Sequence, residues 1–239
     1  MGAILGRLAV RSGEPLIRHA LLAAMRILGR QFVMGRTIEE AIARAAPDEP
    51  KGWRHSYDML GESARTRADA ARYADSYAQA IAAIGRAGAG RGPIEGPGLS
   101  VKLSALHPRF EAAQAARVRG QLASALLDLA RSAKAVDIGL TIDAEEAERL
   151  EFSLDILDDM LADPGLAGWE GFGLAVQAYQ KRAVPLIDWL AERARARGRR
   201  LMVRLVKGAY WDTEIKRAQE RGLGHYPVFT RKCATDVSY

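Results

Sequence analysis

The chain has 239 residues, of which 49% are hydrophobic and 27% are charged; this excludes disorder as its main state, and the length suffices to bury a core. The formal net charge of +6 suggests nucleic-acid binding, but the basic residues are scattered among 29 acidic ones. We therefore favour a basic surface or a site for an anionic ligand, and expect no nucleic-acid partner. The single cysteine, Cys233, cannot form an internal disulfide, so nothing requires an oxidising compartment.

The most apolar stretch is residues 16–35. Within it a stripe of apolar residues recurs at helical spacing and predicts a helix: Leu16, Ile17, Ala20, Leu21, Ala24, Met25 and Leu28. Arg18, His19, Arg26 and Arg30 interrupt this stretch, so it is too polar to span a membrane, and it lacks the order of regions found in a signal peptide. We expect a cytoplasmic protein whose residues 1–50 form an N-terminal helical segment.

Two further patterns predict helices before the first long strand. The run Thr37-Ile38-Glu39-Glu40 has the form of a capping box and predicts a helix to about Ala45, before Pro47. A second stripe consists of Tyr73, Tyr77, Ala80, Ile81 and Ile84. The glycine-rich residues 85–98 lack the G-K-[ST] ending of a phosphate loop, so we interpret them as a helix-to-strand connection.

From residue 99 onwards, short apolar runs alternate with amphipathic stretches. The predicted strands are residues 57–60, 99–106, 137–142, 171–176 and 200–206. The predicted helices are residues 117–135, residues 144–162 and a helix that starts near Pro185. No G-x-G-x-x-G follows the first of these strands, which disfavours a Rossmann fold. We expect an α/β fold over residues 51–239: a partial TIM-type (β/α)₈ barrel of about five βα units, with strands six to eight missing and its edges open.

Polar side chains occupy the ends of the predicted strands, where apolar ones would cost less. They are Lys102, Asp143, Gln177 and Arg204, with Asp58 as a fifth candidate. Burying an ionised group inside a barrel costs roughly several kcal/mol of folding free energy unless the group is paired or binds a ligand. Active sites of such barrels lie at these strand ends. The set therefore predicts a site, while a buried salt bridge such as Lys102 with Asp143 stays open as the alternative.

Several other chemistries are disfavoured by the residues present. One clear acid does not support a two-carboxylate glycosidase. The four histidines lack metal-ligand spacing, so we expect no metal. No nucleophile elbow supports a Ser–His–Asp triad. The residues alone indicate a barrel enzyme with an anionic ligand.

Six ordered motifs resemble the successive signatures of proline dehydrogenase, in the form found in bifunctional proline utilisation proteins. They are residues 57–62 (YDMLGE), 101–110 (VKLSALHPRF), 142–146 (IDAEE), 176–182 (VQAYQKR), 204–212 (RLVKGAYWD) and 229–232 (FTRK). The resemblance implies oxidation of L-proline to Δ¹-pyrroline-5-carboxylate by an enzyme that uses FAD, with electrons passed to a quinone. It also implies peripheral membrane contact for a full-length protein, and leaves the oligomeric state unknown.

The resemblance further implies roles for individual residues. Arg204, Lys102 and Asp143 would be catalytic, with Arg204 near flavin N5 and Gln177 on the pyrimidine side. The other expected cofactor contacts are Val206, Lys207, Gly208, Ala209, Tyr210, Trp211, Thr230 and Lys232. Lys102 would pair with the proline carboxylate. The other expected substrate contacts are Asp58, Leu205, Ala209, Tyr210 and Glu62, the last as an acidic gate that faces an arginine.

The sequence departs from the family pattern in one large respect. The arginine pair that binds the proline carboxylate in the family, on the last barrel helix, has no counterpart here. Two hypotheses follow: the chain is a proline dehydrogenase, or it is a truncated remnant or split-gene half that is catalytically inactive. Bound yellow flavin and proline-dependent dye reduction would separate them.

Overall fold

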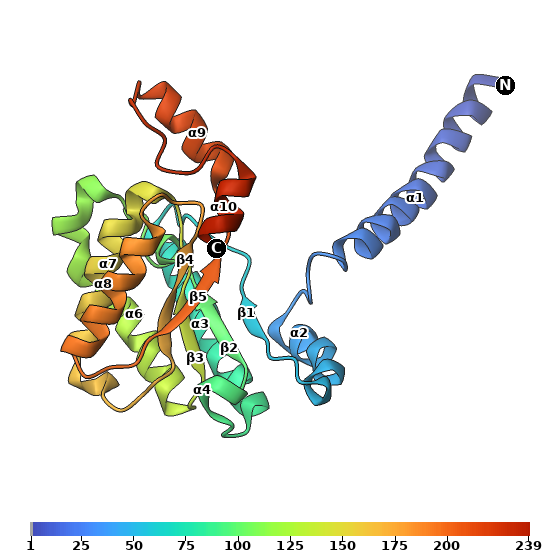
Figure 1. Cartoon of the computed structure of the whole chain (residues 1–239). Helices are drawn as coiled ribbons and strands as arrows, with labels where there is room; N and C mark the ends of the chain where they lie inside the picture. Colours follow the sequence, from blue (N-terminus) through green and yellow to red (C-terminus); the bar gives the residue numbers. More distant parts are fainter. Residues whose placement is uncertain (1) are drawn as a thin grey trace. The chain divides into compact units, whose positions relative to one another are not determined.

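A computed structural model describes residues 2–239, and the side chains of residues 14, 15, 17–25 and 27–239 (Figure 1). The chain divides into two compact units, Met1–Trp53 and Arg54–Tyr239. The first contains helices α1 (Gly2–Gly29) and α2 (Ile38–Ala45), followed by a 3₁₀ turn. Both helices are therefore confirmed.

Helix α2 begins at a cap that differs from the predicted one. The Thr37 hydroxyl accepts a hydrogen bond from the Glu40 backbone N–H at 3.3 Å, as a capping box requires. The Glu40 carboxylate, however, accepts from the N–H of Arg36 at 2.8 Å. The reciprocal bond therefore comes from the N–H of Arg36 instead of the N–H of Thr37. The helix still begins and ends where the sequence predicts.

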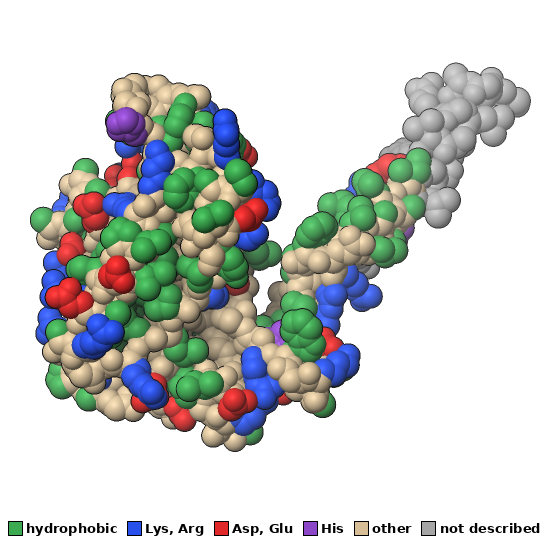
Figure 2. Space-filling view, in the orientation of Figure 1, with side chains coloured by type: hydrophobic (Ala, Val, Ile, Leu, Met, Phe, Trp, Pro, Cys, Tyr) green, Lys and Arg blue, Asp and Glu red, His purple; other side chains and the backbone are tan. Residues whose placement is uncertain are grey.

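The apolar stripe of α1 is exposed in this structure. Ile17, Leu21, Met25 and Leu28 each expose 59% or more of their surface, and green side chains along α1 are visible in Figure 2. The packing that such a stripe usually signals is not seen for these side chains. Leu16, also predicted in the stripe, lies outside the described side chains.

The second unit contains one five-stranded sheet in which every pair of neighbours is parallel, in the order β1-β2-β3-β4-β5. The strands are β1 (Ser56–Asp58), β2 (Gly98–Val101), β3 (Gly139–Ile142), β4 (Phe172–Gln177) and β5 (Met202–Val206). The sequential order and the helix between successive strands are those of βα units. The predicted partial barrel of about five units is confirmed, as a curled half-barrel.

The convex face of the sheet is covered by helices, of which α6, α7 and α8 stand together on one side in Figure 1. The helices between strands are α3 (Arg67–Gly88), α4 (Gly92–Glu95), α5 (Leu103–Leu106), α6 (Ala115–Ala135), α7 (Leu150–Ala162) and α8 (Ala183–Ala196). Leu99, Leu140 and Leu174 alternate outwards from the strands and are buried. On α6, Leu122, Leu126 and Leu129 are buried as well, so the core lies between this face and the helices.

Four of the predicted strands are shorter than expected, and the second differs most. The predicted strand 99–106 ends at Val101, and Leu103–Leu106 form helix α5. The Ser104 backbone accounts for the change: its carbonyl accepts from Ala64 N–H, and its N–H donates to Glu145, so neither pairs with a neighbouring strand. The glycine-rich region also differs, because α3 continues to Gly88 and α4 forms inside the region.

The sheet curls strongly, as one side chain demonstrates. Arg204 on β5 donates to the hydroxyl of Ser100 on β2 at 2.6 Å. In a flat sheet three strand steps of about 4.8 Å would separate these strands by about 14 Å, which is beyond the reach of an arginine side chain. The concave face therefore brings the first and last strands into contact.

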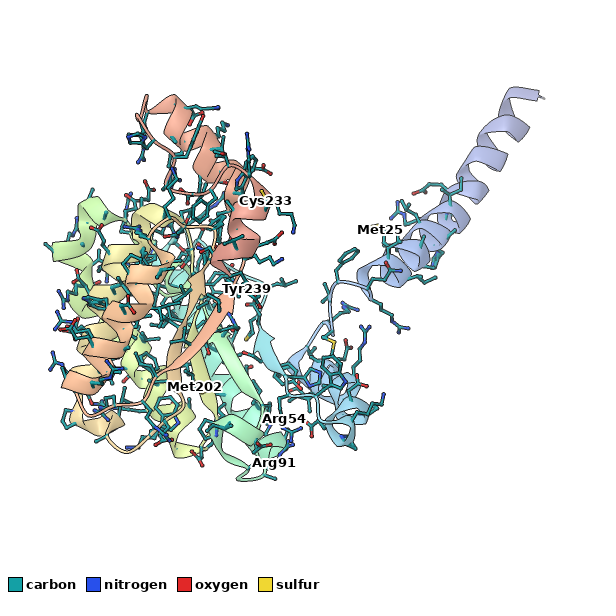
Figure 3. The ribbon with its side chains drawn as sticks, in the orientation of Figure 1. Met25, Arg54, Arg91, Met202, Cys233 and Tyr239 are labelled. Atoms are coloured by element: carbon teal, nitrogen blue, oxygen red, sulfur yellow. The ribbon has the colours of Figure 1, made fainter. Side chains whose placement is uncertain are left out.

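Two helices follow the sheet. They are α9 (Trp211–Glu220) and α10 (Lys232–Ser238), and the exposed Cys233 lies on α10 (Figure 3). Within residues 2–239, no helix combines the length and apolar character that crossing a bilayer requires.

Candidate active site on the concave face

The concave face carries polar side chains on every strand. Alternation places Ser100, Thr141 and Arg204 on this face, where the ladder pairs Ser100 with Thr141. Lys102 and Asp143 directly follow β2 and β3 and lie at the carboxyl ends of the strands. Because these strands are parallel, their polar ends meet at one edge. The predicted residues Asp58, Lys102, Asp143, Gln177 and Arg204 all lie on this face or edge.

Lys102 is held between two carboxylates. Its Nζ lies 2.8 Å from Asp143 Oδ2 and 2.8 Å from Asp58 Oδ1. The Lys102 side chain is only 14% exposed and that of Asp143 only 9%. Burial works to lower the pKa of Lys102, but the hydrogen bonds from Asp143 and Asp58 outweigh it and raise that pKa above its ordinary value. Lys102 is therefore a cation at neutral pH, and the salt bridge that the sequence left open is present.

Arg204 joins the same cluster from the last strand. Its guanidinium donates to Asp143 Oδ1, and to the hydroxyls of Ser100 at 2.6 Å and Ser56 at 3.4 Å. Asp143 thus bridges two cations, with one carboxylate oxygen for Lys102 and the other for Arg204. The arginine side chain is 37% exposed, so part of it is open to a ligand on the concave side.

Gln177, at the end of β4, ties the loops of neighbouring strands together. Its side-chain N–H donates to the carbonyl of Glu145 at 2.9 Å, and its side-chain carbonyl accepts from Ala209 N–H at 3.1 Å. Glu145 is buried, accepts from Ser104 N–H at 3.0 Å, and pairs with Arg149. Burial raises the pKa of this carboxyl above its ordinary value.

A backbone strap after β5, Lys207–Tyr210, lies on the ring of Tyr179. Gly208 has φ +134°, and a Cβ at this position would lie 2.5 Å from the Tyr179 ring. The strap is fixed by Tyr179 N–H, which donates to the Lys207 carbonyl, and by Tyr210 N–H, which donates to the Tyr179 hydroxyl. Glycine is therefore required here by both backbone conformation and close packing.

The strap also reaches the first βα unit. The Tyr210 hydroxyl donates to Glu62 Oε2 at 3.0 Å. Burial, and then the hydrogen bond to Glu62, raise the pKa of Tyr210, so the phenol keeps its proton and remains the donor. Glu62 accepts from Tyr210 in this structure, and its role as an acidic gate that faces an arginine stays a prediction.

The remaining predicted cofactor residues lie near the end of the chain. Trp211 begins α9, and its indole N–H donates to the Phe229 carbonyl at 2.9 Å. Lys207 and Lys232 both bind the carboxylate of Asp236. Their hydrogen bonds lower the pKa of Asp236. Thr230 is exposed close by in sequence, and two cations that share one carboxylate leave this surface positive.

Three residues of the site were missed at the sequence level. Ser56 and Ser100 anchor Arg204, and each stands two positions before a predicted residue, which is the period that places it on the same face. Tyr179 supports the strap; it lies inside the motif of residues 176–182, but no role was assigned to it. Leu205 pairs with Val176 and alternates with Arg204, so alternation places it on the opposite face, and its substrate contact stays a prediction. Within the described residues no group of His, Cys, Asp and Glu could hold a metal.

Comparisons with known proteins agree on one family. A family model described as proline dehydrogenase matches residues 41–239. The bifunctional protein PutA of Salmonella typhimurium is 59% identical over 235 residues, which cover 98% of this chain and 18% of that protein. The PutA of Rhizobium meliloti is 56% identical over 239 residues, which cover 100% of this chain and 19% of that protein.

Solved structures give the same result. A crystal structure of a mutant proline utilization A from Bradyrhizobium japonicum has a TM-score of 0.82 and 61% identity, and the match covers 98% of this chain and 24% of that one. The crystal structure of proline utilization A from Bdellovibrio bacteriovorus, inactivated by N-propargylglycine, has a TM-score of 0.86 and 25% identity. The match covers 94% of this chain and 24% of that one. The chain thus spans about a fifth of the length of the curated relatives it matches.

Proposed function

Because the chain belongs to the proline dehydrogenase family, we propose that it oxidises L-proline to Δ¹-pyrroline-5-carboxylate with FAD as cofactor. The observation that carries this proposal is the concave-face cluster in which Asp143 bridges Lys102 and Arg204. Buried charges of this kind are weak contributors to stability, whereas clusters of them at the strand ends of a barrel are typical of active sites.

The residues present fit a flavin in three respects. Arg204 is partly exposed on the concave face, so it can meet a ring that becomes negatively charged on reduction. Gly208 lets the strap after Arg204 pack directly on Tyr179, so the backbone that would follow the cofactor is held in one position. The positive surface of Lys207 and Lys232 suits the pyrophosphate or adenosine end. We assign the further cofactor contacts to Val206, Ala209, Tyr210, Trp211 and Thr230.

Gln177 fits with a restriction. Its amide carbonyl is already engaged by Ala209 N–H and one of its N–H donors by the Glu145 carbonyl. One N–H remains for the pyrimidine side of a flavin. Gln177 would therefore position the strap while it donates one bond to the cofactor.

When bound, FAD would accept the hydride that leaves the proline carbon next to nitrogen. The role of Arg204 is electrostatic: its guanidinium would stabilise negative charge that develops on the ring during this transfer. Asp143 holds Arg204 in place by a charge-assisted hydrogen bond. Ser100 and Ser56 accept from its other nitrogen, so the guanidinium is oriented before substrate binds.

Lys102 would bind the proline carboxylate. An ammonium has three N–H donors, and three carboxylate oxygens accept from it: Asp58 Oδ1, Asp58 Oδ2 and Asp143 Oδ2. The proline carboxylate would replace the longest of these contacts, the one to Asp58 Oδ2 at 3.0 Å, and the raised pKa of Lys102 keeps it charged. Asp58, Ala209 and Tyr210 would shape the pocket, and Glu62 would close it through its bond to Tyr210.

We further propose that a quinone accepts the electrons. We also propose that the protein is cytoplasmic and that, as part of a longer protein, it contacts the membrane peripherally. These proposals rest on the family alone. The division into a helical segment, residues 1–50, and a barrel segment, residues 51–239, rests on the helical and strand patterns of the sequence and stays a proposal.

The function is tested by purifying the 239-residue chain in the presence of FAD. We expect a yellow protein that reduces a dye when L-proline is added, and a Lys102→Met variant that keeps the colour but needs much more proline. A colourless chain, or a yellow chain without proline-dependent dye reduction, would contradict the proposal and favour a catalytically inactive remnant.

A further inference from the structure

A cationic hollow of about 250 Å³ lies on the barrel unit, lined by residues that the proposed active site does not use. Its walls come from the start of α3, the loop after α5 and the start of α6. Four arginines line it: Arg65, Arg67, Arg109 and Arg117. No Asp or Glu is among its lining residues, so the wall has one sign of charge.

Arginines elsewhere in this unit are mostly paired. Arg119, two residues beyond Arg117, binds Asp159 at 2.7 Å, and Arg131 binds Asp163 at 3.3 Å. Among the described residues, none of the four arginines of the hollow has a carboxylate within ion-pair distance. Part of the excess positive charge of the chain is therefore gathered here without compensation, where mutual repulsion favours an anion.

Three residues that line the hollow are hydrogen-bonded to one another. Gln121 Oε1 accepts from Arg67 Nη2 at 3.4 Å and lies 3.3 Å from His107 Nε2. The other ring nitrogen of His107 accepts from Arg109 N–H at 3.0 Å, so Nε2 carries the proton and donates to Gln121. The Gln121 amide N–H groups have no bond within the described residues and remain as donors.

We propose that this hollow binds a phosphate group, either free or as a phosphomonoester. Guanidinium forks match phosphate oxygens with paired hydrogen bonds. Phosphate also carries nearly two negative charges, about −1.5 to −2, which suits four cations better than a single carboxylate. The volume is below the range of about 300–1,000 Å³ that drug-sized ligands occupy, so the ligand inside is small. This proposal is independent of the proposed oxidation.

The neighbouring hollow gives room for an ester. It has a volume of about 330 Å³ and shares Arg65, His107 and Arg109 with the first. Its lining adds Glu111 and Arg149, and Arg149 is already paired with Glu145. A second anion is therefore disfavoured there, whereas an uncharged substituent on the phosphate has space.

The test measures binding of inorganic phosphate to the full 239-residue chain by calorimetry at constant ionic strength. The key variant is the double substitution Arg65→Gln/Arg109→Gln. The control is Arg86→Gln, which removes one exposed arginine of α3 outside the hollow. We expect saturable binding by the wild type and the control. The double variant should bind about a hundredfold more weakly, since each charged hydrogen bond is worth about tenfold.

A second arm distinguishes the source of the phosphate. Vesicles that contain phosphatidic acid present a phosphomonoester, and phosphatidylserine vesicles of matched charge do not. Binding to phosphatidate alone, lost in the double variant, would identify a lipid headgroup. If circular dichroism shows the double variant unfolded, Arg117→Gln replaces it, with about tenfold weaker binding expected. Unchanged binding by the variants, or no saturable binding of either probe by the wild type, overturns the proposal.

Discussion

The two faces of the five-stranded sheet are built from alternating residues of the same strands, yet they differ in almost every physical property. On the convex face, Leu99 and Leu140 are fully buried beneath helices. On the concave face, Ser100 and Arg204 form a hydrogen-bonded, partly exposed cluster with Asp143. One residue along a strand separates a side chain that stabilises the fold from one that is costly to keep.

The difference between the faces shows which of them stabilises the fold and which is suited to bind a ligand. Apolar burial needs no specific partner, since each buried leucine contributes by the area it removes from water. The concave charges need one another: Lys102 without Asp143 and Asp58 would be a poorly solvated cation. Substitutions on the convex side should therefore act on stability, and those on the concave side on binding and rate.

The largest effect on stability is expected on the convex side. Leu126 on α6 is 0% exposed, and Leu126→Ala should lower the free energy of unfolding by about 2–5 kcal/mol through lost burial and a cavity. Urea unfolding measures it. The control Val184→Ala, at a side chain 59% exposed on α8, should change stability by about 0.5 kcal/mol or less. Equal losses in both variants would contradict the division between the faces.

A smaller loss is expected where the strap crosses Tyr179. Gly208→Ala forces a left-handed backbone onto alanine and places its Cβ against the ring; we expect a cost of about 3 kcal/mol and weaker flavin binding. Gly222→Ala is the matched control, because Gly222 has φ +60° with open space around it, so only backbone strain of about 1–2 kcal/mol is expected. Urea unfolding and flavin titration measure both. Similar costs in the two variants would show that contact with Tyr179 is unimportant.

The smallest effect is a change in pH dependence at Glu145, in the loop after β3. Its folded pKa is raised by burial above the usual 4.5, so its contribution to stability is present below about pH 4.5 and is lost as pH rises through the folded pKa. Glu145→Gln should remove this decline. Urea unfolding at a series of pH values from 4 upwards measures it, with Glu192→Gln, an exposed residue of α8, as control. A decline that persists in Glu145→Gln would show that another group causes it.

The sequence predicted most of the strands and the edge that carries the candidate site, for a physical reason. Apolar runs mark strands buried under helices, and parallel strands place their carboxyl ends together, so Lys102, Asp143 and Arg204 were expected to meet. Each of these residues is conspicuous because a charge directly at a buried strand is costly. Local signals were enough for this part of the fold.

What the sequence did not predict depends on contacts between distant segments. Leu103–Leu106 continue an apolar run, and only the bonds of Ser104 to Ala64 and Glu145 make them a helix. The partner of Glu62 is set by how far the sheet curls, which brings Tyr210 to it from 148 residues away. The expected capping box at Thr37 is only partly formed, because the Glu40 carboxylate accepts from the N–H of Arg36 instead of the N–H of Thr37.

The central claim is that the concave face carries the chemistry, and the rate of flavin reduction by L-proline tests it most directly. The measurement follows flavin bleaching after rapid anaerobic mixing, in FAD-loaded wild type, Arg204→Met and the control Arg200→Met, whose arginine pairs with Glu170 outside the cluster. Arg204→Met should slow reduction by about 10²–10³-fold with a much smaller change in proline affinity, while the control behaves as wild type. Reduction that stays fast in Arg204→Met, with only proline binding changed, would contradict the account.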